Sequence, residues 1–337
     1  MIAAHAPIEA EVQRAQTPLV RIVFLAIICL VASIAAGNRW LGWGKDYEHY
    51  IVAYNIISPT FLFGNTRFEI GYELTAWFFA VPLGLSFATF YTFLSFVALS
   101  VKFYLFERYL ENPPLAAVAY LLLFYSIHEY TQIRAAVAIS FGFLALHLLM
   151  ERKWVYAALL ALLSVSFHSS AIALISLGAA VVLMPRKITL AAVPASALIL
   201  IVLSTAAGSW ISSTFSEINP LIYNYIDNIA ASEALNIFSV ANILFAFSLI
   251  AMMLFNFQNR DEYTFPFMLL TLFGFAFLIA FRESPVVALR TSEIMMLSVV
   301  FAGFRLPVDT QVLVVRGVLL LNGAWITYRA VSEGTLG

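Results

Sequence analysis

Long apolar runs recur along almost the whole chain, and many of them approach the ~20 residues that a helix needs to cross a bilayer. Hydrophobic residues make up 62% of the 337 residues and charged residues 11%, whereas soluble domains have about 25% charged residues. Within lipid, the backbone groups of a run must pair inside the same segment, which favours helices. The sequence therefore predicts an all-α polytopic membrane protein with about 10–13 transmembrane helices.

A single transmembrane domain is expected at 19–330, between a cytoplasmic N-terminal tail at 1–18 and a C-terminal tail at 331–337. Its two largest polar insertions, 38–67 and 208–236, are expected to be external loops. The spans are predicted near 19–37, 68–85, 87–107, 114–127, 131–150, 154–167, 170–184, 188–207, 237–256, 263–281, 287–304 and 311–330.

Lysine and arginine in short loops mark the cytoplasmic side of a membrane protein. Basic clusters at alternating turns are therefore assigned to the cytoplasm: Lys102 with Arg108, Arg152 with Lys153, Arg186 with Lys187, and Arg260. The turns between them, 127–131, 167–170, 208–236 and 281–287, are then external. If 38–67 is also external, the chain would cross inward at 68–85 and outward again at 87–107. The Lys102 cluster would then lie outside, which conflicts with its assignment to the cytoplasm. Either 47–63 enters the membrane or one early span is incomplete.

The net charge of −1 excludes the basic face that nucleic-acid binding requires. The single cysteine, Cys29, lies in the first apolar run and excludes a disulfide framework or a thiolate metal site. We therefore expect neither a nucleic-acid partner nor a cofactor.

The stretch from Tyr125 to Gly142 carries the first candidate site. His128, Glu129, Gln132 and Arg134 fall within seven residues, and an apolar run follows directly. A lone arginine at the mouth of a membrane helix most often reaches back to the lipid headgroups. The three polar neighbours favour a functional site instead, because an intramembrane ionisable residue is costly without a partner or cavity.

A second cluster lies between the first two long apolar runs. Asp46 opens the segment D-Y-E-H-Y, which resembles an amphipathic helix with an aromatic face. Glu69, Tyr72 and Glu73 follow at a spacing that puts them on one helix face. Capping of the helix start would explain the two acids as well, but Gly71 and Tyr72 beside Glu69 suit close approach of a ligand.

Two further clusters fall on the side assigned as external. His168 lies in S-F-H-S-S, between two short apolar runs, and could be either structural or catalytic. Arg282 ends one apolar run, and Arg290 lies about one turn inside the next, three residues before Glu293. An internal ion pair between Arg290 and Glu293 is the simpler explanation of that spacing.

Together these residues indicate an anionic substrate. Fourteen of the eighteen basic residues are arginine, whose planar fork suits bidentate contact with phosphate. A carboxylate or a neutral histidine could accept a proton from an attacking sugar hydroxyl. From the residues alone, the chain is a membrane enzyme or a transporter for an anionic substrate, with a lipid-linked one among the candidates.

Five short motifs occur in a fixed order over roughly residues 40–310: D-Y-E-H-Y, F-E-I-G-Y-E, Q-I-R-A-A-V-A, F-H-S-S-A and A-L-R-T-S-E, with Leu306-Pro307 downstream. In this order they resemble the EpsG family of Wzy-type polysaccharide polymerases. The family pattern matches here at Asp46, Glu69, Tyr72, Arg134, His168 and Arg290. One departure is Ala135, where the family has glutamine after the arginine; Gln132 precedes Arg134 instead.

The resemblance implies a fold similar to the polyprenyl-phosphate-dependent (GT-C-like) glycosyltransferases. It also implies transfer of a growing glycan from undecaprenyl diphosphate to a new lipid-linked repeat unit, at the outer face of the bacterial inner membrane. A chain-length regulator and a flippase are the expected protein partners.

In this hypothesis Arg134 and Arg290, helped by Arg282, hold the diphosphate, so that no metal and no Asp-x-Asp motif is required. Asp46, Glu69 or His168 would activate the acceptor hydroxyl, with Glu69 favoured because it begins a helix. The remaining candidate substrate-binding residues are Tyr72, Gln132, Glu129 and His128.

Three alternatives stay open. An O-antigen ligase-like enzyme would use the same donor with a different acceptor. A flippase or transporter of lipid-linked glycans would need a continuous polar path, and usually symmetric halves, which the sequence does not show. A membrane acyltransferase could use His168 as its base, but nothing marks an acyl-donor site.

Overall fold

The computed structural model describes residues 18–42, 46–57, 68–184, 194–202, 235–259, 263–282, 285–305 and 310–332. Several sequence predictions therefore lie outside the described residues: the tails 1–17 and 333–337, 43–45 and 58–67 of the first loop, 208–234 of the second, most of the span near 188–207, and Arg186, Lys187 and Arg260.

All regular structure in the described part of the chain is helical, which confirms the predicted all-α class. The helices are α2 (Pro18–Gly37), α3 (Tyr47–Ile56), α4 (Ile70–Ala80), α5 (Phe87–Tyr109), α6 (Pro113–Tyr120), α7 (Ile133–Met150), α8 (Trp154–Phe167), α9 (Ala171–Leu183), α12 (Val240–Asn259), α13 (Thr264–Ala280), α14 (Pro285–Met296), α15 (Ser298–Arg305) and α16 (Thr310–Ser332). A π-helical segment, Leu121–Tyr125, continues α6.

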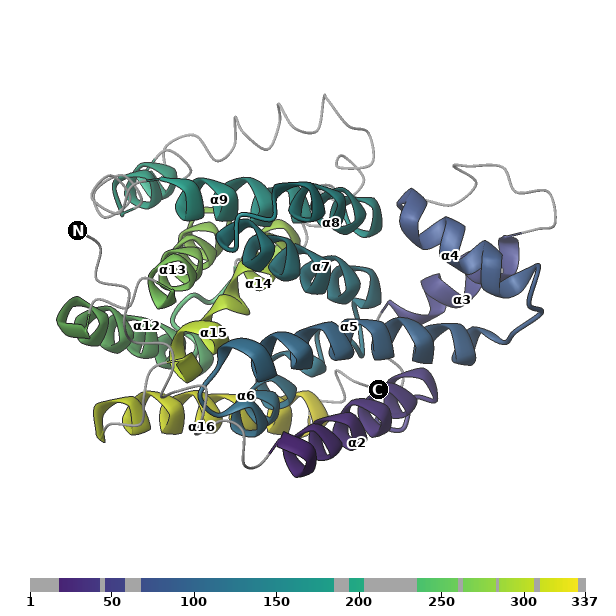
Figure 1. Cartoon of the computed structure of the whole chain (residues 1–337), viewed down its shortest axis with the longest axis horizontal. Helices are drawn as coiled ribbons and strands as arrows, with labels where there is room; N and C mark the ends of the chain where they lie inside the picture. The colour runs from purple at the N-terminus through teal and green to yellow at the C-terminus, as the bar shows by residue number, and fades with distance from the viewer. Residues whose placement is uncertain are drawn as a thin grey trace.

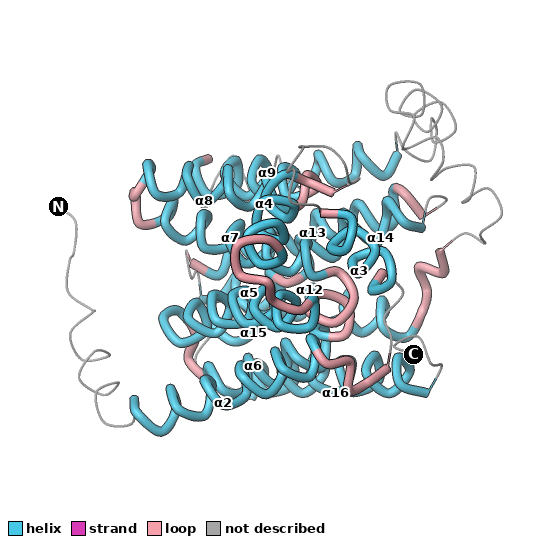
Figure 2. Tube along the Cα trace, turned by 90° about the vertical axis from the view of Figure 1, so that its right-hand side faces the viewer, coloured by secondary structure: helices cyan, strands magenta, loops and turns pink. Residues whose placement is uncertain are grey.

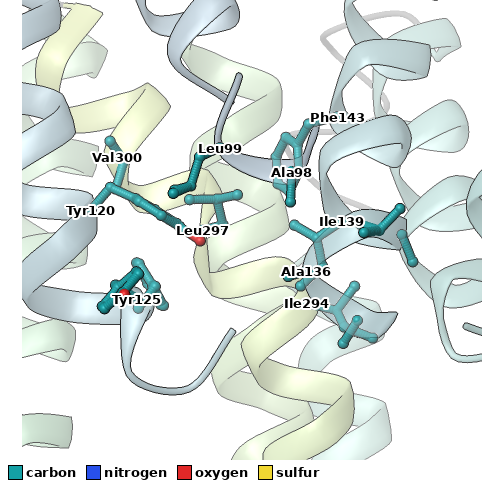
Figure 3. Packing of buried hydrophobic residues seen from close by; sticks show 14 of the residues in the cluster. Ala98, Leu99, Tyr120, Tyr125, Ala136, Ile139, Phe143, Ile294, Leu297 and Val300 are labelled. Atoms are coloured by element: carbon teal, nitrogen blue, oxygen red, sulfur yellow. The ribbon is translucent and has the colours of Figure 1, made fainter. Parts of the chain in front are cut away.

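The helices form stacked layers (Figures 1 and 2). In both views α8 and α9 lie on one side and α2 and α16 on the opposite side, with α5, α7, α13 and α15 between them. The core lies where α5, α7, α15 and the end of α14 meet. Figure 3 shows small residues such as Ala98 and Ala136 beside larger ones such as Phe143, Leu297 and Val300, all almost fully buried.

Five described segments are long and apolar enough to cross a membrane: Leu19–Gly37, Phe87–Tyr109, Ile133–Met150, Val287–Arg305 and Val312–Ser332. Other predicted spans form shorter apolar helices of 10–17 residues: Pro113–Tyr125, Trp154–Phe167, Ala171–Leu183, Val240–Leu254 and Thr264–Ala280. These lengths and compositions are those of a multi-pass membrane protein.

The predicted span near 68–85 differs from these segments, because its helix is neither a candidate crossing nor one of the shorter apolar helices. Its helix, α4, has 11 residues, which is shorter than the ~17 residues of the shortest spanning helices. The helix ends at Ala80, just before Pro82, and Gly84 adopts a positive φ of 59°. Proline cannot continue the helix and glycine permits the turn.

This difference also removes the conflict over the orientation of the first helices. A side chain at Gly37, the last residue of α2, would collide with Thr92 and the backbone of Ala88, so α5 starts beside the end of α2. Figure 1 shows α3 and α4 beyond the start of α5. Because α5 then returns antiparallel to α2, its C-terminal Arg108 lies at the same end as the start of α2.

Basic residues gather at this end of the bundle, which we call the basic end. Arg21 pairs with Glu107 from the last turn of α5. Glu151 accepts contacts from Lys153 at 2.7 Å and from Arg108 at 3.4 Å. Hydrogen bonds from Lys153 and from the Tyr109 hydroxyl lower the pKa of the Glu151 carboxyl to about 2. Charges from the start of α2, from the end of α5 and from the turn between α7 and α8 thus compensate one another.

Lys102 is the exception, and its assignment to a cytoplasmic loop is wrong. It lies within α5 and is fully buried. Its ammonium group lies 2.5 Å from the carboxylate of Glu129 and donates to the backbone carbonyl of Ala136 at 3.2 Å. A charge can stay in the apolar interior only with such partners, and the partner is 27 residues away in the sequence.

We predict that Gly37→Ala destabilises the folded protein by about 1–3 kcal/mol, because an added methyl group overpacks the contact between α2 and α5. The matched control is Gly317→Ala in α16, where an added Cβ meets no atom within 4 Å, so helix propensity should stabilise it by up to about 1 kcal/mol. Thermal unfolding of both variants in detergent measures the difference. Equal melting temperatures would contradict the close approach of α2 and α5.

Candidate active site

The carboxylate of Glu69 connects three parts of the chain. Glu69 precedes α4, and one of its oxygens pairs with the guanidinium of Arg134 in the first turn of α7. The other oxygen accepts hydrogen bonds from the backbone N–H of Ser169 at 3.0 Å and from its hydroxyl at 3.2 Å. The Nδ1 atom of His168 lies 3.2 Å from that same oxygen. Glu69, Arg134 and His168, three of the predicted site residues, therefore meet.

Aromatic rings surround the Arg134 guanidinium. Its central carbon lies 4.1 Å from the ring centre of Phe68 and 5.7 Å from that of Tyr50. Its Nε donates to the Tyr50 hydroxyl at 3.4 Å. Tyr72 contacts both Tyr50 and Phe68. Because the Arg134 side chain is 12% exposed, its charge acts in a partly desolvated environment, where electrostatic contacts are stronger than in water.

Glu69 lies outside the candidate spans, and its carboxyl is held in the ionised form. Burial alone would raise its pKa, but His168, Arg134 and the Ser169 amide outweigh burial and lower the pKa to about 2. A general base works best with a pKa near the operating pH. Glu69 is therefore better suited to orienting Arg134 and His168 than to taking a proton itself.

His168 is the stronger candidate for the proton acceptor. The ring is buried at the C-terminal end of α8, and neither ring nitrogen makes a hydrogen bond of good geometry with the described residues. The contact of Nδ1 with Glu69 orients the ring electrostatically. A buried imidazole with unused hydrogen-bonding capacity can accept a proton from a substrate hydroxyl.

Gln132 and Arg290 connect this group to α14. The amide of Gln132 donates to the carboxylate of Glu293 on α14 at 3.3 Å. The positive charge of Arg290 acts on both Glu293 and Tyr50. The structure thus connects the start of α7 with α14, although these segments are about 160 residues apart in the sequence.

Asp46, Arg282 and Tyr72 have different surroundings. Asp46 precedes α3 and is half-buried, with its charge acting on Tyr50 one turn later. Arg282 follows α13 and is exposed. Tyr72 is fully buried, and its hydroxyl has no hydrogen-bond partner in the described part of the chain. The role predicted for each of them stays a prediction.

The close approach expected at Gly71 serves helix packing. A side chain at Gly71 would collide with the backbone and hydroxyl of Ser166 on α8, so the missing Cβ brings α4 against α8 and places Glu69 beside Ser169. The sequence signal was correct about a close approach, but the partner is a helix.

His128 and Glu129 belong to a separate buried cluster. Both are fully buried, and Glu129 binds Lys102 and the Tyr120 hydroxyl. The Tyr120 hydroxyl also lies 3.3 Å from Nδ1 of His128. This cluster fixes the turn before α7 that leads to Gln132 and Arg134. Lys102 had no signal as a partner of this cluster in the sequence, because Glu129 is 27 residues away along the chain. Tyr120 had none because it lies within an apolar run.

The fold and the site define a multi-pass helical membrane protein with an arginine–carboxylate–histidine group at one end of its bundle. The sequence profile of the EpsG family matches residues 22–330, nearly the whole chain. The chain therefore belongs to the EpsG family, a Wzy-type polymerase-like family, as the five motifs indicated. No curated protein and no solved structure matches the chain.

We predict that Glu69→Gln changes how stability depends on pH. Since the folded-state pKa of Glu69 lies below its usual value of 4.5, its ionised form stabilises the fold above about pH 4.5, and this contribution is lost as the pH falls towards about 2. The wild type should therefore melt above Glu69→Gln at about pH 6, and the difference should shrink at about pH 3.

Glu48→Gln is the matched control, because Glu48 is exposed on α3. Its melting temperature should follow that of the wild type across this pH range. A difference between the wild type and Glu69→Gln that does not depend on pH would contradict the ionised Glu69 contact.

Proposed function

We propose that this chain is a polysaccharide polymerase that joins oligosaccharide repeat units carried on undecaprenyl diphosphate. Membership of the EpsG family supports polymerase chemistry in polysaccharide biosynthesis. The observation that carries the finer proposal is the meeting of Arg134, Glu69 and His168 from three segments at one end of the bundle. This arrangement offers a cation, an orienting carboxylate and a proton acceptor together.

Arg134 binds the diphosphate of the donor in this proposal, together with the half-buried Arg290 and the exposed Arg282. An acceptor hydroxyl attacks the anomeric carbon of the donor glycan, and the bond from that carbon to the diphosphate oxygen breaks. The bonding electrons leave with undecaprenyl diphosphate, whose charge the guanidinium groups stabilise as it develops. Because arginine supplies this positive charge, we propose that the reaction requires no metal ion.

His168 accepts the proton of the attacking hydroxyl. Glu69 holds the histidine and Arg134 in position, since its carboxylate contacts both. Tyr50 and Phe68 line the arginine and offer aromatic faces on which a sugar ring can stack. Each residue thus has a role that follows from its contacts.

The site faces the outside of the bacterial inner membrane in this proposal. The basic end of the bundle carries Arg21, Arg108 and Lys153, and basic residues favour the cytoplasmic side. Arg134 begins α7 and Glu151 follows its last residue, so the candidate site lies at the opposite end from the basic cluster.

The purified protein in detergent should convert an undecaprenyl-diphosphate repeat unit into a ladder of longer products on a gel, in the presence of EDTA. A ladder that disappears with EDTA would contradict metal independence. A single transfer to a lipid A core acceptor, without a ladder, would indicate a ligase. Movement of the intact repeat unit across liposomes, without new products, would indicate a transporter.

In the same assay we predict that Arg134→Lys lowers the rate of ladder formation by about 100-fold, because lysine keeps the charge but loses the fork that stabilises the leaving diphosphate. Arg21→Lys is the matched control, since Arg21 also pairs with a glutamate but lies at the basic end. It should polymerise like the wild type. Near-normal product lengths with Arg134→Lys would rule out the bidentate role.

A further inference from the structure

The guanidinium of Arg39 lies in a cage of three tyrosine rings. Its central carbon is 3.7 Å from the ring centre of Tyr47, 4.3 Å from that of Tyr91 and 4.8 Å from that of Tyr130. Arg39 is only 8% exposed. Tyrosine faces attract a cation, so the cage holds the charge, but rings alone do not satisfy its N–H donors.

Only one side of this guanidinium is used by the protein. Nη1 donates to the backbone carbonyl of Tyr130. Nε and Nη2 are buried and make no hydrogen bond of good geometry within the described part of the chain, although the Tyr91 and Tyr130 hydroxyls lie close enough to interact with the guanidinium. In the same part of the chain, no ion pair joins Arg39 to a carboxylate. Lys102 and Arg134, by comparison, each pair with a glutamate. A buried cation without a counter-ion is costly and indicates a missing anion.

The two unused nitrogens lie on the same edge of the guanidinium plane. Nε and Nη2 form the side-on fork of arginine, and two parallel N–H donors fit two oxygens of a phosphoryl group. In Arg134, by comparison, Nε already donates to Tyr50 and Nη1 to Glu69. In Arg39 both nitrogens of this edge are buried and make no hydrogen bond with the described residues.

The cage is rigid before any ligand binds. The Tyr91 hydroxyl donates to the carbonyl of Tyr130 at 3.1 Å, which is the same carbonyl that binds Arg39. The Tyr130 hydroxyl accepts the backbone N–H of Leu41 at 2.9 Å and donates to the carbonyl of Gly42. These bonds fix two of the rings, so the fork keeps its orientation, which lowers the cost of binding an anion.

The cage adjoins the candidate active site. Tyr47 and Tyr50 are three residues apart on α3, and both contact Tyr91, at 5.9 Å and 6.2 Å between ring centres. Tyr50 in turn contacts Arg134. Arg39 and Arg134 thus border one continuous layer of tyrosines, at the end of the bundle opposite the basic end.

The depth of Arg39 fits a lipid-linked phosphate. Trp40, the next residue, is 62% exposed, and exposed tryptophans concentrate at the level of the lipid headgroups. Arg39 itself follows the C-terminal end of α2, a candidate membrane span. A phosphoryl group attached to a membrane lipid lies at this same level.

We propose that Arg39 is a phosphoryl-binding residue that takes two oxygens of a polyprenyl phosphate or diphosphate through Nε and Nη2, next to the Arg134 group. The identification of the ligand as a polyprenyl lipid rests on the proposed function, whereas the binding of a phosphoryl group by Arg39 does not. Arg39 thereby gives the site a further cation, which shares the tyrosine layer with Arg134.

The test measures binding of undecaprenyl monophosphate to the purified full-length protein in detergent, by ligand-dependent thermal shift and by titration. Arg39→Lys keeps the charge within the cage but loses the fork, and should weaken binding by about 10- to 100-fold, the range for lost hydrogen bonds to a charged group. Arg305→Lys is the matched control, because Arg305 also donates to a backbone carbonyl and stacks on a tyrosine, at the basic end. It should bind within about twofold of the wild type.

Two competition arms identify the source of the phosphoryl group. Inorganic diphosphate should compete in an Arg39-dependent way but more weakly than the lipid, and phosphatidylglycerol should not compete. Equal affinity for inorganic diphosphate would overturn the lipid-linked assignment. Competition by phosphatidylglycerol as strong as that by undecaprenyl monophosphate would overturn it in favour of a general headgroup site.

Unchanged binding in a folded Arg39→Lys variant would overturn the proposal and make Arg39 a purely structural cation. If Arg39→Lys does not fold, the Arg134→Lys variant decides. Because the tyrosine cage and Arg39 are intact in that variant, it should keep part of the phosphate binding. Complete loss of binding would overturn an Arg39 site.

The polymerisation assay separates this inference from the proposed function. Phosphate binding that depends on Arg39, in a protein that forms no ladder, would refute the polymerase and support the site. A ladder that forms normally in Arg39→Lys, together with unchanged phosphate binding, would refute only the role of Arg39.

Discussion

The structure depends on ion pairs between charges that lie within a bundle with little access to water. Glu69 shows this most clearly, because its carboxylate binds Arg134 on α7 and Ser169 before α9 while starting α4 itself. Neither α3 nor α4 is long enough to be anchored by a membrane crossing of its own. The ion pair, the tyrosine layer and the contact of Gly71 with Ser166 hold these short helices in place. The same contacts therefore both form the candidate site and hold α3 and α4 in the fold.

The Lys102–Glu129 pair has a different function from the Glu69 group. It is fully buried, and both charges are consumed by internal partners, including the Tyr120 hydroxyl and the carbonyl of Ala136. Such a pair contributes little net stability compared with apolar residues, but removing one partner is strongly destabilising. Its position at the turn before α7 sets the direction in which that helix starts. The start of α7, and with it the position of Arg134, thus depends on a pair of charges that is buried inside the protein.

The sequence predicted the all-α membrane class because long apolar runs have few other solutions in lipid. It also selected Glu69, Arg134 and His168, which meet in the structure, because polar residues at the ends of apolar runs are unusual. It failed for Lys102, since a lysine six residues before Arg108 resembles a loop cluster, and its partner is distant in the sequence. The span near 68–85 was too long because apolar residues continue past Pro82, where the helix has already ended.

The arginines of this chain differ in how much of their guanidinium the protein uses. At the basic end, Arg21 pairs with a glutamate, and Arg305 binds a carbonyl and a tyrosine ring. These contacts join neighbouring helices. Arg134 is divided between Glu69 and Tyr50. In Arg39 the protein binds Nη1, whereas Nε and Nη2 make no hydrogen bond with the described residues, within a cage whose rings are held by hydrogen bonds. Of these two arginines opposite the basic end, Arg134 thus has two nitrogens bound by protein side chains, whereas Arg39 has one nitrogen bound, by a backbone carbonyl. The side-on edge of Arg39, more than the number of arginines, is what we propose for an anionic substrate.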